Sequence, residues 1–180
     1  MAEPRRDPRP RCTVRPARPR DAVLLARWRL EPSIRRFQPL PAADEETLRE
    51  DLARQHDGDL RARRGDKFQW IVEADGEPAG WITLAVISWD HGLAEIGYAL
   101  STRFQRLGVM SRALRQVLAE LFTHTDLERI EARCATPNVA SRRVLERAGF
   151  RCEGTLKAYF VLHGERVDNE LYAVLKRDWT

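Results

Sequence analysis

The stretch Ser101-Thr-Arg-Phe-Gln-Arg-Leu-Gly108 runs directly into a segment, residues 109–122, whose apolar side chains recur at helical spacing. Apolar residues three and four apart form one face of a helix, so this segment is expected to pack one side against the core. The first turn of a helix carries four N–H groups without intrahelical partners and about half a positive charge. Gly108 lies where the helix begins, and without a side chain it lets an anion approach the backbone closely. The sequence therefore predicts a phosphate-binding site at this junction of loop and helix.

The segments on either side of this junction alternate between the two-residue period of strands and the 3.6-residue period of helices. They predict one mixed α/β domain, residues 12–180, with element order β-α-α-β-β-β-α-β-α-β-β and no internal repeat. A loop of residues 32–43, with three prolines, is expected to lie over a cleft. The expected strands are residues 12–15, 67–74, 78–88, 93–100, 129–134, 151–161 and 166–176, and the expected helices are residues 19–30, 44–60, 108–123 and 137–148.

The N-terminal segment, residues 1–11, is rich in proline and arginine and has almost nothing to bury, which predicts a disordered basic tail. The whole chain carries a net charge of +4, yet its first 20 residues alone contain seven arginines and two acidic residues. The rest of the chain is therefore close to neutral, which argues against a specific nucleic-acid-binding surface.

Cysteines and histidines are few and scattered along the chain. The three cysteines, Cys12, Cys134 and Cys152, contain no C-x-x-C pair, and no histidine has a second ligand at metal-binding spacing. We therefore expect reduced thiols and no metal site. The sequence shows neither a bilayer-spanning apolar run nor an N-terminal secretory signal, so we expect a cytoplasmic protein without a membrane partner.

Four motifs along the chain together resemble those of the GCN5-related N-acetyltransferases. They are Ala94-Glu-Ile-Gly-Tyr-Ala-Leu100, Gln105-Arg-Leu-Gly-Val-Met110, Pro137-Asn-Val-Ala-Ser141 and Gly149-Phe150. Within that family the chain looks like the branch that acetylates the N-terminal alanine or serine of ribosomal proteins. The resemblance covers about residues 12–176 and implies a mostly antiparallel seven-stranded mixed sheet flanked by about four helices.

The resemblance also implies that acetyl-CoA is the co-substrate, with its pyrophosphate bound by backbone amides of a Q/R-x-x-G-x-G/A segment. Met110 departs from the small residue that is usual at the last position of that motif. Asn138 and Ser141 match an asparagine near the pantetheine arm and a serine near the sulfur, although Asn138 is also a good helix N-cap in its own right. The implied cofactor-binding residues are Tyr98, Leu100, Gln105, Arg106, Leu107, Gly108, Val109, Met110, Asn138 and Ser141.

Direct attack of an amine on the thioester requires a base that takes a proton from the amine. An α-amine with a pKa near 8 costs about 1.4 kcal/mol to deprotonate at pH 7, whereas a lysine costs about 4.6 kcal/mol, so a modest base suffices for an N-terminus. Glu95, on the strand that enters the expected cleft, is the first candidate for this base, and Glu131 is the second. Each of them also fits the simpler alternative of an ion pair on a half-exposed strand.

The departing thiolate needs an acid, and the tetrahedral intermediate needs hydrogen-bond donors. Many relatives use a tyrosine as the acid at the position of Leu145, so the prediction moves to Ser141, with Tyr159 as the alternative. Backbone N–H groups of residues 95–100 are expected to stabilise the oxyanion.

The sequence therefore predicts an acetyl-CoA-dependent N-acetyltransferase whose acceptor is a protein N-terminal amine. One alternative is a small acceptor such as a polyamine or aminoglycoside, which would require an acidic pocket, whereas the region of residues 28–40 is aromatic and basic. A second alternative is an acyl-CoA-binding module without catalysis. Relatives often dimerise, so a homodimer stays open.

Overall fold

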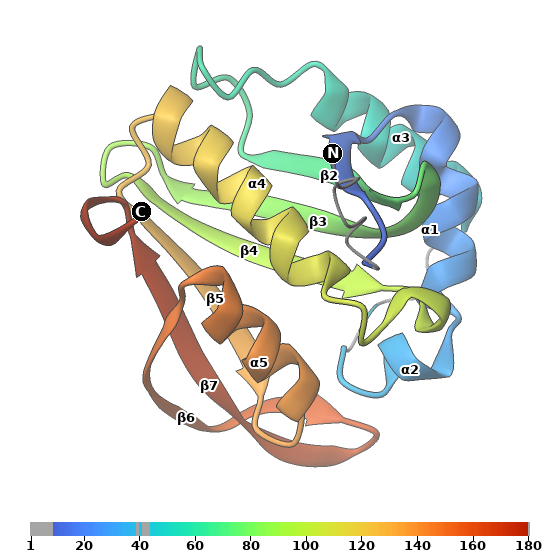
Figure 1. Ribbon diagram of the computed structural model, residues 1–180, viewed down its shortest axis with the longest axis vertical. Helices are drawn as coiled ribbons and strands as arrows, with labels where there is room; N and C mark the ends of the chain where they lie inside the picture. Colours follow the sequence, from blue (N-terminus) through green and yellow to red (C-terminus); the bar gives the residue numbers. More distant parts are fainter. Residues whose placement is uncertain (1–8, 39, 41–43, 180) are drawn as a thin grey trace, which may run out of the picture.

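The computed structural model describes residues 9–38, 40 and 44–179. They form one seven-stranded sheet of order β1-β2-β3-β4-β5-β7-β6, with helices on both faces (Figure 1). Each neighbouring pair of strands is antiparallel except β4 and β5, which are parallel. The strands are β1 Cys12–Pro16, β2 Lys67–Ala74, β3 Glu77–Ser88, β4 Leu93–Leu100, β5 Arg129–Ala135, β6 Arg151–Leu162 and β7 Glu165–Leu175, and the α-helices are α1 Ala22–Arg29, α2 Pro32–Arg35, α3 Glu45–His56, α4 Val109–His124 and α5 Val139–Ala148.

The two faces of the sheet bury separate apolar cores. Helices α4 and α5 lie across one face (Figure 1), and the other face packs against α1 and α3, where Trp28 stacks on Trp81 with ring centroids 6.1 Å apart. Successive strand residues point to opposite faces. Ile96 and Tyr98 therefore face α4 and α5, whereas Glu95 faces the side of α1 and α3.

The sheet opens between β4 and β5. Their pairing covers Leu93 to Glu95 on β4 and Arg129 to Glu131 on β5, after which β4 continues beside β3 and β5 continues beside β7. One side of residues 96–100 therefore has no strand partner, and an extended ligand arm can add to it as a strand would. This opening, which we call the split, leads through residues 101–108 directly into α4.

The fold class and the mixed seven-stranded sheet predicted from the sequence are confirmed, and the element order is confirmed except for one additional helix, α2. Two helical segments differ from expectation. Pro32 follows α1 but also begins the short helix α2, inside the segment expected to be a loop, because proline is favoured in the first turn of a helix. Helix α3 ends at His56 and does not reach Leu60, since the chain turns away at Asp57 and Gly58.

Most of the predicted tail, residues 1–8, lies outside the described residues. Its end is hydrogen-bonded to the domain: Arg112 Nη2 donates to Pro10 O, and Arg11 N donates to Asp75 Oδ1, both at 2.8 Å. Gln116 Nε2 donates to Cys12 O at 3.0 Å, so side chains of α4 cover the outer edge of β1. Within the described residues, every helix is too short or too polar to span a membrane.

Candidate active site

The N-terminus of α4 has the geometry of an open anion site. Gly108 precedes the helix with φ 69°, and Arg106 also has a positive φ of 64°, so the loop turns sharply into the helix. No side chain caps the first turn of α4, whereas Asp44 caps α3 and Asn138 caps α5. A Cβ added at Gly108 would meet only Arg112 Nη1, at 3.7 Å, so the approach to the backbone is clear. These features fit a phosphate group of acetyl-CoA.

The carboxylate of Glu31 holds the loop before α4 in place. Glu31, between α1 and α2, accepts hydrogen bonds from Ser101 Oγ at 2.7 Å and from Thr102 N and Oγ1 at 2.8 Å. Burial alone would raise the pKa of Glu31, but these donors outweigh burial and hold the pKa below its ordinary value. The loop that would carry the phosphate is therefore fixed to the helical layer on the other face.

The predicted cofactor-binding residues of this loop differ in the exposure of their side chains. Val109 and Met110 have 0% and 3% of their surface exposed, so a ligand meets their backbone and not their side chains. Met110 packs into the α4 core, which explains how a larger residue is accepted there. Gln105 Nε2 donates to Leu100 O at 3.0 Å and so braces the loop against β4. Arg106 and Leu107 are exposed at the rim.

On the face of α4 and α5, the split brings three protic side chains together. The Tyr98 hydroxyl of β4 lies 2.7 Å from Ser141 Oγ of α5, and Asn138 Oδ1 accepts from Ser141 N at 3.1 Å. Burial raises the pKa of Cys134 on β5, although a hydrogen bond with Ser141 opposes the shift. Burial also raises the pKa of Tyr98 despite its bond to Ser141. The Tyr98 hydroxyl and the Cys134 thiol therefore stay protonated at neutral pH.

On the opposite face, the candidate bases are ion-paired. Glu95 contacts Arg133 through Oε2, and the Arg133 guanidinium lies over the Tyr159 ring, 5.4 Å from its centroid. Glu131 accepts from Arg129 Nε at 2.9 Å. The ion-pair alternative thus describes both carboxylates in this structure. The sheet separates Glu95 and Tyr159 on one face from Ser141 on the other.

Gln38 is a site residue that sequence reasoning missed. Its Nε2 donates to Tyr98 O at 2.6 Å, on the side of β4 that β5 leaves unpaired. Gln38 belongs to the loop expected over a cleft, of which residues 39 and 41–43 lie outside the described residues. Nothing in the local sequence singles out this glutamine, because its partner is a backbone carbonyl 60 residues away.

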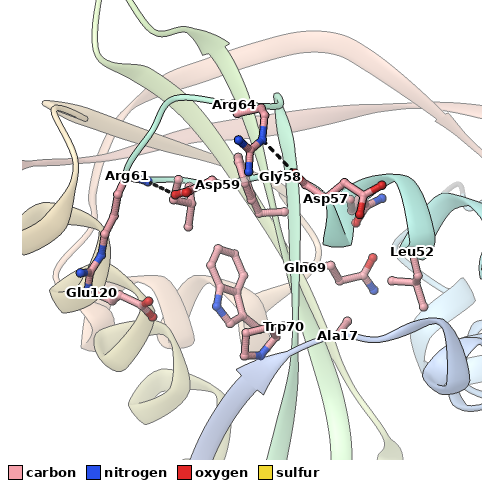
Figure 2. A pocket seen from close by; sticks show the side chains of 14 residues that line it. Ala17, Leu52, Asp57, Gly58, Asp59, Arg61, Arg64, Gln69, Trp70 and Glu120 are labelled. Carbon is pink, nitrogen blue, oxygen red and sulfur yellow. Dashed lines mark hydrogen bonds between the residues drawn. The ribbon is translucent and has the colours of Figure 1, made fainter.

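A pocket of about 780 Å³ lies elsewhere, between the end of α3, the loop of residues 57–64, β2 and Glu120 of α4 (Figure 2). Its rim is tied together by its own residues: Asp59 Oδ1 accepts from Arg61 N at 3.0 Å, and Arg64 Nε donates to Asp57 O at 3.1 Å. Glu120 lies 12 residues along α4 from Gly108, about 18 Å at helical rise, so this pocket is not part of the split.

Comparison with known proteins agrees with this geometry. Residues 11–151 match the family model described as an acetyltransferase (GNAT) domain. An uncharacterised N-acetyltransferase p20 of Bacillus licheniformis is 28% identical over 94% of this chain and 95% of its own length. Spermidine N(1)-acetyltransferase of Escherichia coli K12 is 30% identical over 64% of this chain and 59% of its own length.

A solved structure of RimL, a ribosomal L7/L12 α-N-protein acetyltransferase in complex with coenzyme A, superposes with a TM-score of 0.80. It is 25% identical and the match covers 91% of this chain and 93% of that one. Its coenzyme A forms a disulfide with a cysteine. The split sheet, the uncapped helix beside it and these matches together show that the chain belongs to the GNAT family and is an acetyl-CoA-dependent N-acetyltransferase.

Proposed function

We propose that the enzyme acetylates the N-terminal α-amine of a protein that begins with alanine or serine, such as a ribosomal protein. The observation that carries this proposal is the charge state of the acceptor face. Glu95 and Glu131 are each paired with an arginine, Arg133 and Arg129. The charge of each of these two carboxylates is therefore offset by an arginine, which disfavours a polycation, whereas a peptide N-terminus brings a single amine whose deprotonation requires only a modest base.

In the proposed complex the acetyl-CoA diphosphate binds the backbone amides at the start of α4, beside Gly108. Residues 105–110 supply these amides, and the pantetheine arm runs along the open side of β4 from Leu100 to Tyr98. Both backbone groups of a strand residue point the same way, so the Tyr98 N–H is directed into the split with the carbonyl that Gln38 binds. That N–H is the proposed oxyanion donor.

The residues of the two faces then have complementary roles. Ser141, with its backbone fixed by Asn138, donates its proton toward the departing sulfur, and Glu95 takes the proton that the amine releases. Cys134 beside Ser141 supports this placement, because in the RimL structure the sulfur of coenzyme A also lies against a cysteine. Glu131 and Tyr159 are the second choices for base and acid.

Release of free thiol from acetyl-CoA tests this function. We expect turnover with short peptides beginning with Ala or Ser, and none with the same peptides carrying a blocked N-terminus and an internal lysine. Spermidine is the matched small-amine arm, since one relative is a spermidine acetyltransferase over 64% of this chain. Turnover with spermidine but not with peptides would contradict the proposal, and binding of acetyl-CoA without any turnover would identify a module that has lost catalysis.

A further inference from the structure

The hydroxyls of Tyr98 and Ser141 form a pair whose proton positions are limited by their geometry. Tyr98 Oη lies 2.7 Å from Ser141 Oγ and 3.2 Å from Ser141 O. A carbonyl oxygen only accepts, and each hydroxyl carries one proton. Two arrangements are therefore open. Tyr98 donates to the carbonyl and Ser141 donates to Tyr98, or Tyr98 donates to Ser141 Oγ and the Ser141 proton points elsewhere.

The second arrangement is the one that serves the proposed acid. Ser141 N is held by Asn138 Oδ1 at 3.1 Å and its Oγ accepts from Tyr98, so the Ser141 proton becomes available to a group in the split. The 2.7 Å contact suits an O–H···O hydrogen bond with either hydroxyl as the donor, so it accommodates this donation. Because burial raises the pKa of Tyr98, the phenol keeps its proton throughout the neutral range and remains a donor.

We propose that Tyr98 is a positioning residue that acts through Ser141, by directing the Ser141 proton to the sulfur that leaves during acetyl transfer. The proposal rests on the proposed role of Ser141. As the carbon–sulfur bond breaks, its electron pair goes to sulfur, and the Ser141 proton moves to that sulfur. The Tyr98 hydrogen bond stabilises the negative charge left on Oγ. The proton lost by the attacking amine returns through solvent and restores the Ser141 hydroxyl, so atoms and charge balance.

The position of Tyr98 explains why the family's usual tyrosine is dispensable here. That position is Leu145, which is fully buried and has no acidic proton to donate. Tyr98 instead enters from β4, the strand on the opposite side of the split.

The test measures the pKa of the thiol of bound coenzyme A and not turnover, so it does not depend on the acceptor. The ultraviolet absorbance of the thiolate is followed against pH in saturated complexes of the wild type, Tyr98→Phe, Ser141→Ala and the double variant. A hydrogen bond to a charged group favours that group, so losing either hydroxyl should raise the bound-thiol pKa by about one unit, a tenfold change in thiolate fraction at a given pH. The double variant should shift no further than the single ones.

Tyr172→Phe is the matched control, because Tyr172 is also buried but its hydroxyl donates to Glu170 Oε2 at 3.3 Å. It should titrate like the wild type. If the bound-thiol pKa of Tyr98→Phe equals that of the wild type while that of Ser141→Ala is shifted, only the positioning role of Tyr98 is overturned. If both variants show the bound-thiol pKa of the wild type, the positioning role of Tyr98 and the acid role of Ser141 are both overturned. Failure of the acceptor proposal would appear only in the peptide assay.

A second measurement covers the case in which Tyr98→Phe does not fold. The chain has three tyrosines, so 3-fluorotyrosine in a Tyr159→Phe/Tyr172→Phe background labels Tyr98 alone. Fluorination makes the phenol a stronger donor, so the bound-thiol pKa should be lower than in the same double variant with ordinary tyrosine. An equal pKa in the two proteins would contradict the proposal.

Discussion

At the scale of single residues, the Glu95 carboxylate is oriented by Arg133 and lies on the face of the sheet where we propose that the acceptor binds. The contact engages Oε2, which leaves Oε1 to take a proton. We predict that Glu95→Gln lowers kcat about 10- to 1,000-fold, as expected for loss of one general base, with little change in KM for acetyl-CoA.

Steady-state thiol release with an Ala-starting peptide checks this prediction. Glu153→Gln is the control, because Glu153 also pairs with an arginine of β5, Arg129, but is exposed. A full loss of activity in Glu131→Gln with normal turnover in Glu95→Gln would move the base to Glu131.

Ser141 provides the second residue-scale prediction. Ser141→Ala should lower kcat by the same factor of about 10 to 1,000, because it removes the proposed acid. Helix α5 should remain intact, since Asn138 caps it through the Ser141 backbone N–H. The control is Ser88→Ala, whose Oγ accepts from His91 N in the distant turn between β3 and β4. Unchanged turnover in Ser141→Ala would leave Tyr159 as the acid.

Among the elements, the start of α4 is the most sensitive to charge. Gly108→Asp should weaken acetyl-CoA binding by at least about tenfold, because it strains a left-handed residue and places a carboxylate where a phosphate is proposed. Gly76→Asp is the matched control: Gly76 also has a positive φ, 81°, with open space around its Cβ, but lies in the turn between β2 and β3. Isothermal calorimetry with near-native affinity for Gly108→Asp would contradict the phosphate site.

The loop before α4 gives a second prediction at this scale. Glu31→Gln should weaken acetyl-CoA binding about 3- to 30-fold, because the amide keeps only one accepting oxygen, so the hydrogen bonds of either Ser101 or Thr102 are lost and the loop is held less firmly. Calorimetry again measures the effect. Glu77→Gln serves as the control, since Glu77 pairs with Arg103 of the same loop at the surface, where an ion pair contributes little. Equal affinities in the two variants would show that the anchor is not needed.

Local patterns predicted the elements well wherever one period persisted over a whole segment. The bounds predicted for residues 67–74 and 93–100 match β2 and β4 to the residue, because a turn adjoins each strand: Asp75-Gly76 follows β2, and the turn that ends at Gly92 precedes β4. The helix α2 was missed because a proline both stops one helix and starts another, and only the tertiary contacts decide between them.

The candidate site could be predicted only in part. The uncapped start of α4 follows from the local sequence, and Tyr98 and Ser141 were named through family resemblance. Their hydroxyl–hydroxyl contact depends on the register between β4 and α5, 43 residues apart, which packing alone sets. The pairing of Glu95 with Arg133 likewise bridges two strands that are not in regular register beyond Glu131.

For the molecule as a whole, a buried ion pair ties the N-terminal strand to the first helix. Asp21 is 3% exposed and binds both terminal nitrogens of Arg15, at 2.7 and 2.8 Å, while Arg15 Nε binds Glu73 of β2. Asp21→Asn should lower the free energy of unfolding by about 2–4 kcal/mol, because the Arg15 guanidinium loses its charged partner and one of its two hydrogen bonds to residue 21. Urea unfolding measures this, and Asp126→Asn, in an exposed pair with Arg63, should change it little.

The same pair gives a pH dependence. Burial alone would raise the pKa of Asp21, but the bonds from Arg15 and from Arg18 N outweigh it and hold the pKa below its ordinary value. A carboxyl with a depressed folded-state pKa stabilises the fold above the unfolded pKa, about 3.9, and that stability is lost as pH falls through the folded value. The difference between wild type and Asp21→Asn should therefore be constant from about pH 5 to 8 and shrink below about pH 4.

The two borders of the sheet present very different surfaces to a neighbouring molecule. Arg112 and Gln116 occupy carbonyls at the outer side of β1, so that border cannot accept a further strand there. Strand β6 is 12 residues long and mostly exposed, but its pairing with β7 shifts register twice and Ala158 has a φ of 50°. Such an interrupted border is a poor template for a continuous added strand. The enzyme is thereby protected from strand-on-strand aggregation at both borders, and changes that straighten β6 would favour precipitation at high concentration even while leaving catalysis intact.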